Sequence, residues 1–334
     1  MHKFLEEDIN MQVPITQQYA LGIDIGGTNT VFGLVDPRGV IHYRGAFSTK
    51  AQETVDTFID TLHTNILPAI EEVGGSEFIK GIGIGAPNGN FYKGTIEYAP
   101  NLNWKGVIPL CQLVTKKFNL PSALTNDANA AAVGEMMYGA AKGMKDFIMI
   151  TLGTGVGSGI VANGNIIYGH DGFAGELGHT IIVPDGRLHW GTGAKGSLEA
   201  YCSATGVVLT TLELLDKYNN TYSLLRKYKD EEINSKVVFD CAMENDIIAK
   251  KVFDFTGDIL GKALANFVMF SSPESIILFG GLCKAGDFIL NPTRKSMEEN
   301  LLPIFQNKVK LLFSQLNESD AAILGASALV WELK

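Results

Sequence analysis

The sequence predicts an α/β protein in which one supersecondary unit occurs twice. Residues 22–39 and 149–165 each contain an apolar run, a cluster of Gly and Thr, a second apolar run and a turn. Two apolar runs joined by a glycine turn are typical of a β-hairpin, and its recurrence far along the chain indicates two copies of one unit. The 334 residues are enough for two domains, each with its own core.

Composition narrows the class of protein. Hydrophobic residues make up 46% of the chain and charged residues 19%, which is typical of a globular protein. The net charge of −9 argues against general affinity for nucleic acid or anionic membranes. The chain has no signal segment and no apolar run long enough to span a bilayer, so we expect a cytoplasmic protein. The scattered cysteines are expected to be reduced thiols: Cys111, Cys202, Cys241 and Cys283.

Apolar spacing and turn residues predict the elements in chain order. Before the second hairpin we expect a polar extension at residues 1–18 and the first hairpin at 19–44. Helices are then expected at 52–73 and 106–119, and strands at 81–89 and 121–125. After it we expect long helices, a buried strand ending in two glycines, and a final strand and helix over residues 205–270, 274–281 and the last twenty. The change of domain is expected near residues 125–145.

The first glycine turn, in DIGGTNT, is a candidate phosphate site. Gly26 and Gly27 allow a tight turn whose amides can approach phosphate oxygens without a Cβ in the way. Thr28 and Asn29 can add side-chain hydrogen bonds. The carboxylate of Asp24 would repel phosphates unless a divalent cation lay between them, so Asp24 is a candidate to hold Mg²⁺ through water. The alternative is an ordinary glycine-rich hairpin.

The second turn, in TLGTGVGSGI (151–160), is its expected partner. Its G-x-G-x-G spacing also occurs in dinucleotide-binding folds, where the turn opens directly into a helix. Here a second β-run follows at residues 159–161, so the turn joins two strands and a dehydrogenase is disfavoured.

Asp127 is the best candidate for catalysis. It precedes a run of strong helix formers, and we expect it to cap the N-terminus of that helix. The helix terminus would keep the carboxylate ionised, and an ionised acid beside a phosphate site can accept a proton from an attacking hydroxyl. Asn126 could bind a neighbouring hydroxyl. Capping alone is the plainer interpretation of Asp127.

A third group lies in GFAGELGHT (172–180) and GSLEA (196–200). Glu176, His179 and Glu199 supply many hydrogen-bond acceptors between glycines. Such a set suits a small polyol whose hydroxyls point in several directions. A metal site at His179 and a solvated loop are the alternatives.

Together these motifs resemble those of the ROK family of sugar kinases, which share the actin-like, hexokinase-like ATPase fold. The resemblance runs from about residue 20 to the C-terminus through DIGGTNT, GIGIGAPNG, APNLNW, TNDANAAAVGE, TLGTGVGSG, GELGHT, GSLEA, ILFGG and AAILGASAL. It implies two actin-like (ribonuclease H-like) domains, each a mixed β-sheet flanked by helices, with a cleft between them. The small domain would cover residues 19–125 and be completed by a C-terminal helix at about 320–334, and the large domain would cover 126–319.

The resemblance also implies a reaction and its residues. The activity would be ATP-dependent, Mg²⁺-assisted phosphorylation of the primary (C6) hydroxyl of a hexose, first of all glucose, by a homodimer. Asp127 would be the general base. The ATP phosphates would lie on Gly26, Gly27, Thr28, Gly153, Thr154 and Gly155, and the adenosine beside Gly280 and Gly281. The sugar would be bound by Asn101, Asn126, Glu176, His179, Glu199 and the backbone around Gly85.

One departure from the family pattern concerns zinc. Many members hold zinc with a histidine of the E-x-x-H segment and three cysteines of a C-x-C-G-x-x-G-C pattern, but here the cysteine positions hold Trp190, Thr192 and Ser197. A tetrahedral site needs four ligands, and His179 with the nearby His189 does not supply them. We therefore predict no zinc, with His179 kept for the sugar and the 180–197 loop ordered by packing alone.

Other functions within the family stay open. N-acetylglucosamine, N-acetylmannosamine and fructose are alternative substrates. The family also contains transcriptional repressors with an N-terminal helix-turn-helix domain, for which about twenty residues before Gly22 are too few. A sugar sensor without catalysis is a further alternative, but the presence of Asp127 and of both glycine turns favours the kinase.

Overall fold

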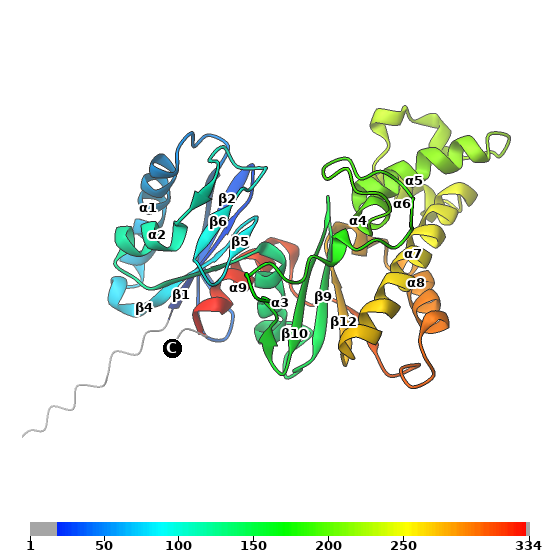
Figure 1. Cartoon of the computed structure of the whole chain (residues 1–334). Helices are drawn as coiled ribbons and strands as arrows, with labels where there is room; N and C mark the ends of the chain where they lie inside the picture. Colours follow the sequence, from blue (N-terminus) through cyan, green and yellow to red (C-terminus); the bar gives the residue numbers. More distant parts are fainter. Residues whose placement is uncertain (1–18, 332–334) are drawn as a thin grey trace, which may run out of the picture.

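A computed structural model describes residues 19–331 as two lobes, each built on a five-stranded β-sheet (Figure 1). The extension expected at residues 1–18 lies outside the described residues. The first sheet consists of β1 (Tyr19–Ile25), β2 (Asn29–Val35), β3 (Ile41–Ser48), β4 (Ile79–Gly85) and β8 (Ser122–Thr125). The second consists of β9 (Phe147–Leu152), β10 (Val156–Ala162), β11 (Asn165–Ile166), β12 (Ser275–Phe279) and β13 (Lys310–Phe313).

The two sheets have the same topology. Their strand orders are β3-β2-β1-β4-β8 and β11-β10-β9-β12-β13. In the first sheet β1 runs antiparallel to β2 and parallel to β4, and in the second β9 runs antiparallel to β10 and parallel to β12. The turns between the paired strands are residues 26–28 and residues 153–155. This confirms the predicted repeat of one supersecondary unit.

Two helices cover one face of the first sheet. Phe58 and Leu62 of α1 (Val55–Glu72) and Val114 of α2 (Leu110–Phe118) pack with strand residues in one apolar core. Helix 106–119 was predicted too long at its start, because β7 (Val107–Ile108) pairs there with β6 (Thr95–Glu97), which also pairs with β5 (Gly89–Asn90). The helix begins after Pro109, which is its N-cap residue.

Helix α9 (Glu318–Trp331) packs against the strands of the first sheet, and α3 (Asp127–Tyr138) packs on α9 and on β10 (Figure 1). The close approach of α9 depends on two glycines of the sheet, because a Cβ on Gly22 or Gly83 would overlap a carbonyl oxygen of the helix. Since α3 contacts elements of both lobes, it forms part of the connection between them.

Helices dominate the rest of the second lobe (Figure 1). The α-helices are α4 (Glu199–Cys202), α5 (Ala204–Lys217), α6 (Ser235–Met243), α7 (Ile247–Ser271) and α8 (Asp287–Asn300). Short 3₁₀ turns in the chain are η1 (Ser76–Phe78), η2 (Leu177–His179), η3 (Leu224–Lys227), η4 (Asp230–Glu232) and η5 (Gly281–Ala285). Within residues 19–331, no helix has both the length and the apolar character needed to cross a bilayer.

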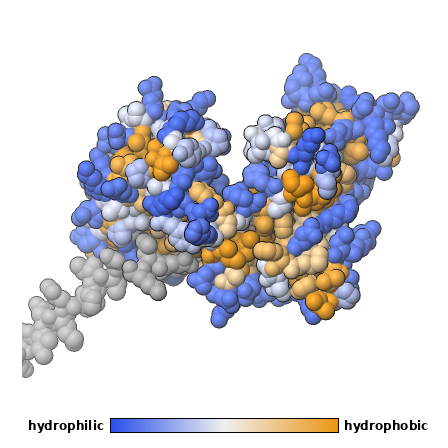
Figure 2. All heavy atoms as spheres, viewed as in Figure 1, coloured by the Kyte–Doolittle hydropathy of each residue, from blue (hydrophilic) through white to orange (hydrophobic). Residues whose placement is uncertain are grey.

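A deep notch separates the two lobes at one side of the molecule (Figure 2). Contacts between the lobes include the rings of Phe91 and Tyr168, which stack with centroids 4.2 Å apart, and the Asn90 side chain, which donates a hydrogen bond to the Asp171 carbonyl at 2.7 Å. The notch is the cleft expected between two actin-like domains.

Candidate active site

The sheet register brings one group of predicted residues together. Asp24 pairs with Gly85 across β1 and β4, and Gly85 pairs with Thr125 across β4 and β8. These three strands are parallel, so their carboxyl ends meet at one edge of the sheet, and Asn126 and Asp127 follow Thr125 directly. A Cβ built on Gly85 would lie 3.2 Å from Asp24 Oδ1 and 3.9 Å from the Asp127 Cα, so Gly85 lies against both aspartates.

The surroundings of Asp24 change the pKa of its carboxyl group. Burial, with a further contribution from the charge of Asp127, raises the pKa of Asp24 to about 7. No lysine, arginine or histidine within residues 19–331 forms an ion pair with Asp24. A partly buried carboxyl group beside a second carboxylate, with no cationic side chain on it, is a suitable place for a divalent cation.

The cap of α3 differs from the prediction by one residue. The side chain of Asn126 is the N-cap, and its Oδ1 accepts a hydrogen bond from the Asn129 amide at 2.7 Å. Asp127 is the first residue of the helix, and its Oδ1 accepts from the adjacent Ala128 amide at 2.9 Å. The expectation that Asp127 caps the helix is therefore wrong, because Asn126 already satisfies the amide that a cap must reach. Asp127 stays exposed at the helix N-terminus.

The first glycine turn lies against a predicted sugar residue. The Gly26 amide donates to the Asn29 carbonyl at 3.0 Å, which closes the turn. A Cβ on Gly27 would lie 2.8 Å from the backbone oxygen of Asn101, so the turn and Asn101 are in direct contact. Thr28 and Asn29 are exposed at the tip.

The second glycine turn has an equivalent neighbour. The Gly153 amide donates to the Gly155 carbonyl at 3.0 Å, and Thr154 is exposed at the tip. A Cβ on Gly155 would overlap the carboxylate of Glu199. Each turn thus lies against one residue predicted to bind sugar, although no hydrogen bond or ion pair in the described part of the chain links one turn to the other.

Glu176 and His179 lie at η2. The His179 Nε2 and Glu176 Oε2 atoms are 3.9 Å apart, and both side chains are exposed. The pKa of Glu176 is raised above its ordinary value, first by partial desolvation of its carboxyl group and then by the charges of Asp127 and Glu199, while His179 acts to lower it. The carboxyl groups of Asp127, Glu176 and Glu199 are thus close enough for their charges to interact, so these three acids lie in one region of the molecule.

Glu199 has two fixed contacts. Its Oε2 accepts a hydrogen bond from the Val156 amide at 2.7 Å, and its Oε1 lies 2.6 Å from Nε2 of His189. His189 is buried, with 3% of its surface exposed. The sequence offers no role for His189 beyond that of an insufficient zinc ligand, and it does not predict the contact with Glu199. Its position ten residues before an expected sugar-binding acid was the one available signal.

We predicted that packing alone orders the 180–197 loop, but an ion pair and hydrogen bonds hold it as well. The guanidinium of Arg187 lies 4.6 Å from the centre of the Tyr201 ring, forms an ion pair with Glu213 at 2.7 Å and donates to Thr210 Oγ1 at 3.0 Å. Bridges pair Ile181 with Ser197 and Leu188 with Lys195. Arg187 can make these bonds because its guanidinium carries five donors.

The possible metal ligands in this region are His179, His189 and Glu199, whose ligand atoms lie within 4.8 Å of one another. Two of the three already bond to each other, since His189 meets Glu199 at 2.6 Å. The set offers one ligand fewer than a closed structural zinc site requires. The absence of zinc stays a prediction.

The predicted adenosine residues lie beside the second turn. Gly280 has a φ of 107° and lies against Leu152, the residue before Gly153. Its neighbour Gly281 borders a cavity of about 520 Å³ between α6 and η5, lined in part by Phe239 and Asp240. This cavity therefore lies near the second turn.

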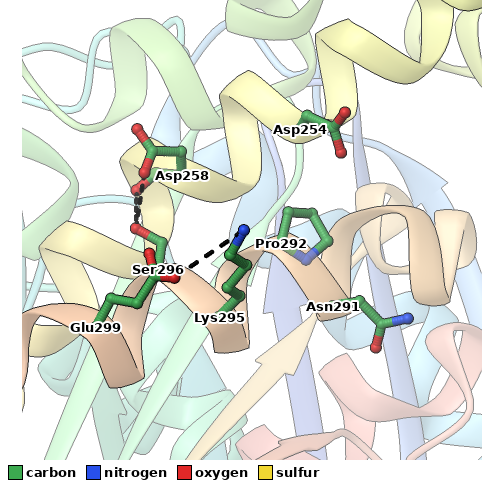
Figure 3. A pocket seen from close by; sticks show the side chains of 7 residues that line it. All are labelled: Asp254, Asp258, Asn291, Pro292, Lys295, Ser296 and Glu299. Atoms are coloured by element: carbon green, nitrogen blue, oxygen red, sulfur yellow. Dashed lines mark hydrogen bonds and ion pairs between the residues drawn. The ribbon is translucent and has the colours of Figure 1, made fainter.

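A second hollow lies elsewhere. The groove between α7 and α8 has a volume of about 660 Å³ and is lined by Asp254, Asp258, Asn291, Pro292, Lys295, Ser296 and Glu299 (Figure 3). The Ser296 hydroxyl donates a hydrogen bond to Asp258 Oδ1 at 2.9 Å, and Lys295 forms an ion pair with Glu299 at 4.0 Å. It contains none of the predicted site residues.

Two matching sheets, a glycine turn in each and a notch between the lobes define a protein of the actin-like fold. Residues 20–332 match the ROK family over nearly the whole chain. The chain belongs to the ROK family, which confirms the resemblance seen in its motifs.

Individual relatives agree with this assignment. The chain is 35% identical over 322 residues to a glucokinase of Halalkalibacterium halodurans, covering 95% of this chain and 96% of that protein. It is 30% identical to a xylose repressor of Bacillus spizizenii, covering 94% of this chain and 77% of the repressor. Its structure is similar to that of a ROK family glucokinase from Streptomyces griseus in complex with glucose and AMPPNP, with a TM-score of 0.75, 32% identity and coverage of 93% and 98%.

Proposed function

We propose that this protein is a glucokinase that transfers the terminal phosphoryl group of ATP to the C6 hydroxyl of glucose. The observation that carries the proposal is the position of Asp127, an exposed carboxylate at a helix N-terminus with Asp24 and Gly85 on one side and Glu176 nearby. The similarity to glucokinases over almost the full chain, and to one that binds glucose and an ATP analogue, supports glucose and ATP as the substrates.

Asp127 would act as the general base. Asp127 is the first residue of α3, and its exposure leaves the carboxylate accessible to a bound hydroxyl. As the C6 oxygen forms its bond to the terminal phosphorus, the bond from that phosphorus to ADP breaks and the hydroxyl proton moves to Asp127. Asn126, whose Oδ1 is engaged at the cap, would bind a neighbouring hydroxyl through its side-chain nitrogen.

The two glycine turns would hold the phosphates. The phosphates would lie against Gly26, Gly27 and Thr28 on one lobe and against Gly153, Thr154 and Gly155 on the other, with Thr28 and Thr154 exposed at the tips. The Gly26 and Gly153 amides already close their turns, so the other backbone amides would be the donors to phosphate. Asp24 would hold Mg²⁺ through water, and the side chains of Thr28 and Asn29 would add hydrogen bonds to the phosphates. Bound there, Mg²⁺ would neutralise charge on the phosphates. The adenosine would lie at Gly280 and Gly281, in the cavity that Phe239 borders.

The sugar would lie between the lobes. Asn101 touches the first turn and Glu199 touches the second, so a hexose bound to both would lie close to the phosphates on either side. Glu176 and His179 would bind further hydroxyls. Closure of the notch over the sugar would exclude water, which competes with the sugar as phosphoryl acceptor.

The test is ADP release from MgATP in the presence of separate sugars. We expect the highest kcat/KM with glucose, compared with mannose, fructose, N-acetylglucosamine and N-acetylmannosamine. A higher kcat/KM for an N-acetylhexosamine or for fructose would support the kinase activity but show that glucose is not the preferred substrate. We further propose a homodimer, which light scattering would check.

A sugar-responsive regulator is the second candidate, favoured by the 30% identity to a xylose repressor. If the protein is such a regulator, calorimetry should detect sugar binding, and no sugar of the panel should cause ADP release. The same two measurements therefore separate the candidates.

A further inference from the structure

We infer that His189 is a positioning residue for the proposed kinase, holding the carboxylate of Glu199 in place for the sugar. The inference rests on the proposed function in its use of a hexose. It starts from a buried ring that makes a polar contact at each of its two nitrogens.

The surroundings of the ring determine which nitrogen carries the proton. The amides of Gly191 and Thr192 both point at Nδ1 of His189, at 3.1 and 3.0 Å, and the Thr192 hydroxyl lies 3.1 Å from it. An amide N–H can only donate, so Nδ1 must accept and carries no proton. The proton of the neutral ring is then on Nε2, where it is donated to Glu199 Oε1 at 2.6 Å.

The carboxylate of Glu199 is thereby held at both oxygens. Oε1 accepts from His189, and Oε2 accepts from the Val156 amide at 2.7 Å, directly after the second glycine turn. Two donors on different atoms fix the plane of a carboxylate, whereas one donor allows it to rotate. Without His189, Glu199 would keep only its contact with the turn.

His189 itself is rigid. Its ring stacks on Trp190, with centroids 4.4 Å apart and an interplanar angle of 25°, and meets the edge of His179 at 5.7 Å. Trp190 and Thr192, which surround His189, occupy positions where the family pattern has cysteines. Hydrogen bonds centred on one imidazole therefore do here what the resemblance assigns to zinc in many relatives. They connect the loop to Glu199, and the ring contact of His189 reaches His179.

Two matched substitutions test the contacts of the two ring nitrogens separately. His189→Gln can place an amide N–H near the Nε2 position and keep the bond to Glu199. His189→Asn is too short to reach Glu199, but its oxygen can still accept from the loop amides near the Nδ1 position. The Asn variant thus tests the loss of the Glu199 contact while the loop contacts are kept.

Steady-state kinetics and calorimetry with glucose supply the readout. We expect His189→Asn to raise the KM and Kd for glucose by about tenfold or more, as for a lost hydrogen bond to a charged group. The KM for MgATP should change less than about twofold, and His189→Gln should stay within about threefold of wild type. Equal losses in both variants, or a loss confined to MgATP, would overturn the inference.

A spectroscopic measurement does not depend on turnover. The ¹⁵N chemical shifts of the His189 ring in the wild-type protein should show a protonated Nε2 and a bare Nδ1. The opposite tautomer, or one equivalent of zinc in the purified protein that His189→Asn lacks, would also overturn the inference. If the wild-type protein binds glucose without phosphorylating it, the proposed kinase fails while the Kd comparison and the ring shifts still test His189.

Discussion

Asp24 lies next to Asp127 across Gly85, and burial together with the charge of Asp127 raises the pKa of Asp24 to about 7. The two carboxyl groups differ in environment, since Asp24 is partly buried at the end of a strand and Asp127 is exposed at the start of a helix. Different environments for two neighbouring acids suit different roles, one beside a cation and one as a base.

Asp127→Asn should lower kcat by about a thousandfold, because general base catalysis commonly contributes about a hundredfold to ten-thousandfold. The amide keeps the shape of the side chain, so the Kd for glucose should change less than about threefold. ADP release and calorimetry measure the two quantities. Asp254→Asn, in the groove between α7 and α8, is the control and should leave both unchanged. A variant of Asp127 with a near-normal rate would reject the base assignment.

Asp24 should make the free energy of unfolding depend on pH. Its folded pKa of about 7 lies above the ordinary value of 3.8, so the folded protein holds a proton that the unfolded chain has lost between these values. The stabilisation that this group contributes is fully present below about pH 4 and is lost as the pH rises through about 7, by on the order of 4 kcal/mol.

Asp24→Asn removes this dependence. In urea titrations without nucleotide, the variant should match the wild type near pH 4 and be the more stable protein at pH 8. Asp127→Asn should move the pH of the transition downward, since it removes the charge that adds to the raised pKa. A constant difference between Asp24→Asn and wild type across this range would show that Asp24 does not titrate as described.

Gly155→Ala should destabilise the protein by about 1–3 kcal/mol, because the added Cβ would overlap the Glu199 carboxylate. Gly153→Ala in the same turn is the matched control, as a Cβ there meets no atom within 4 Å. Thermal melts without ligand compare the two. Equal melting temperatures would mean that Glu199 can move away from the turn at little cost.

Arg187→Met should destabilise the protein by about 2–4 kcal/mol, since its guanidinium is 9% exposed and bonds to several oxygens of α4 and α5. Lys236→Met provides the comparison. Lys236 pairs with Asp240 in solvent, and we expect a change below about 0.5 kcal/mol. Denaturant titrations measure both, and a small effect at Arg187 would mean that the 180–197 loop is held by other contacts.

Treatment with a chelator, followed by return of Mg²⁺ alone, should restore full activity, because no zinc is predicted. The assay is ADP release with glucose after dialysis into metal-free buffer. Recovery that required added zinc would assign the ligand set of His179, His189 and Glu199 to a metal instead.

Several features could be predicted because they depend on neighbours in the chain. The hairpin turns at residues 26–28 and 153–155 follow from glycines between apolar runs of strand length. Helix α1 follows from its apolar spacing. The cap at α3 was missed by one residue because Asn126 and Asp127 are both good caps, and only the path of the chain out of β8 decides between them.

By itself, the sequence determined the two hairpins, the helices between them and the residue types around the turns, since local spacing encodes all of these. Only the tertiary structure decided that Asp24 faces Asp127, because that contact depends on the register of β1, β4 and β8. It also decided that His189 bonds to Glu199. A loop brings these two side chains together through bonds whose partners no periodic pattern reveals.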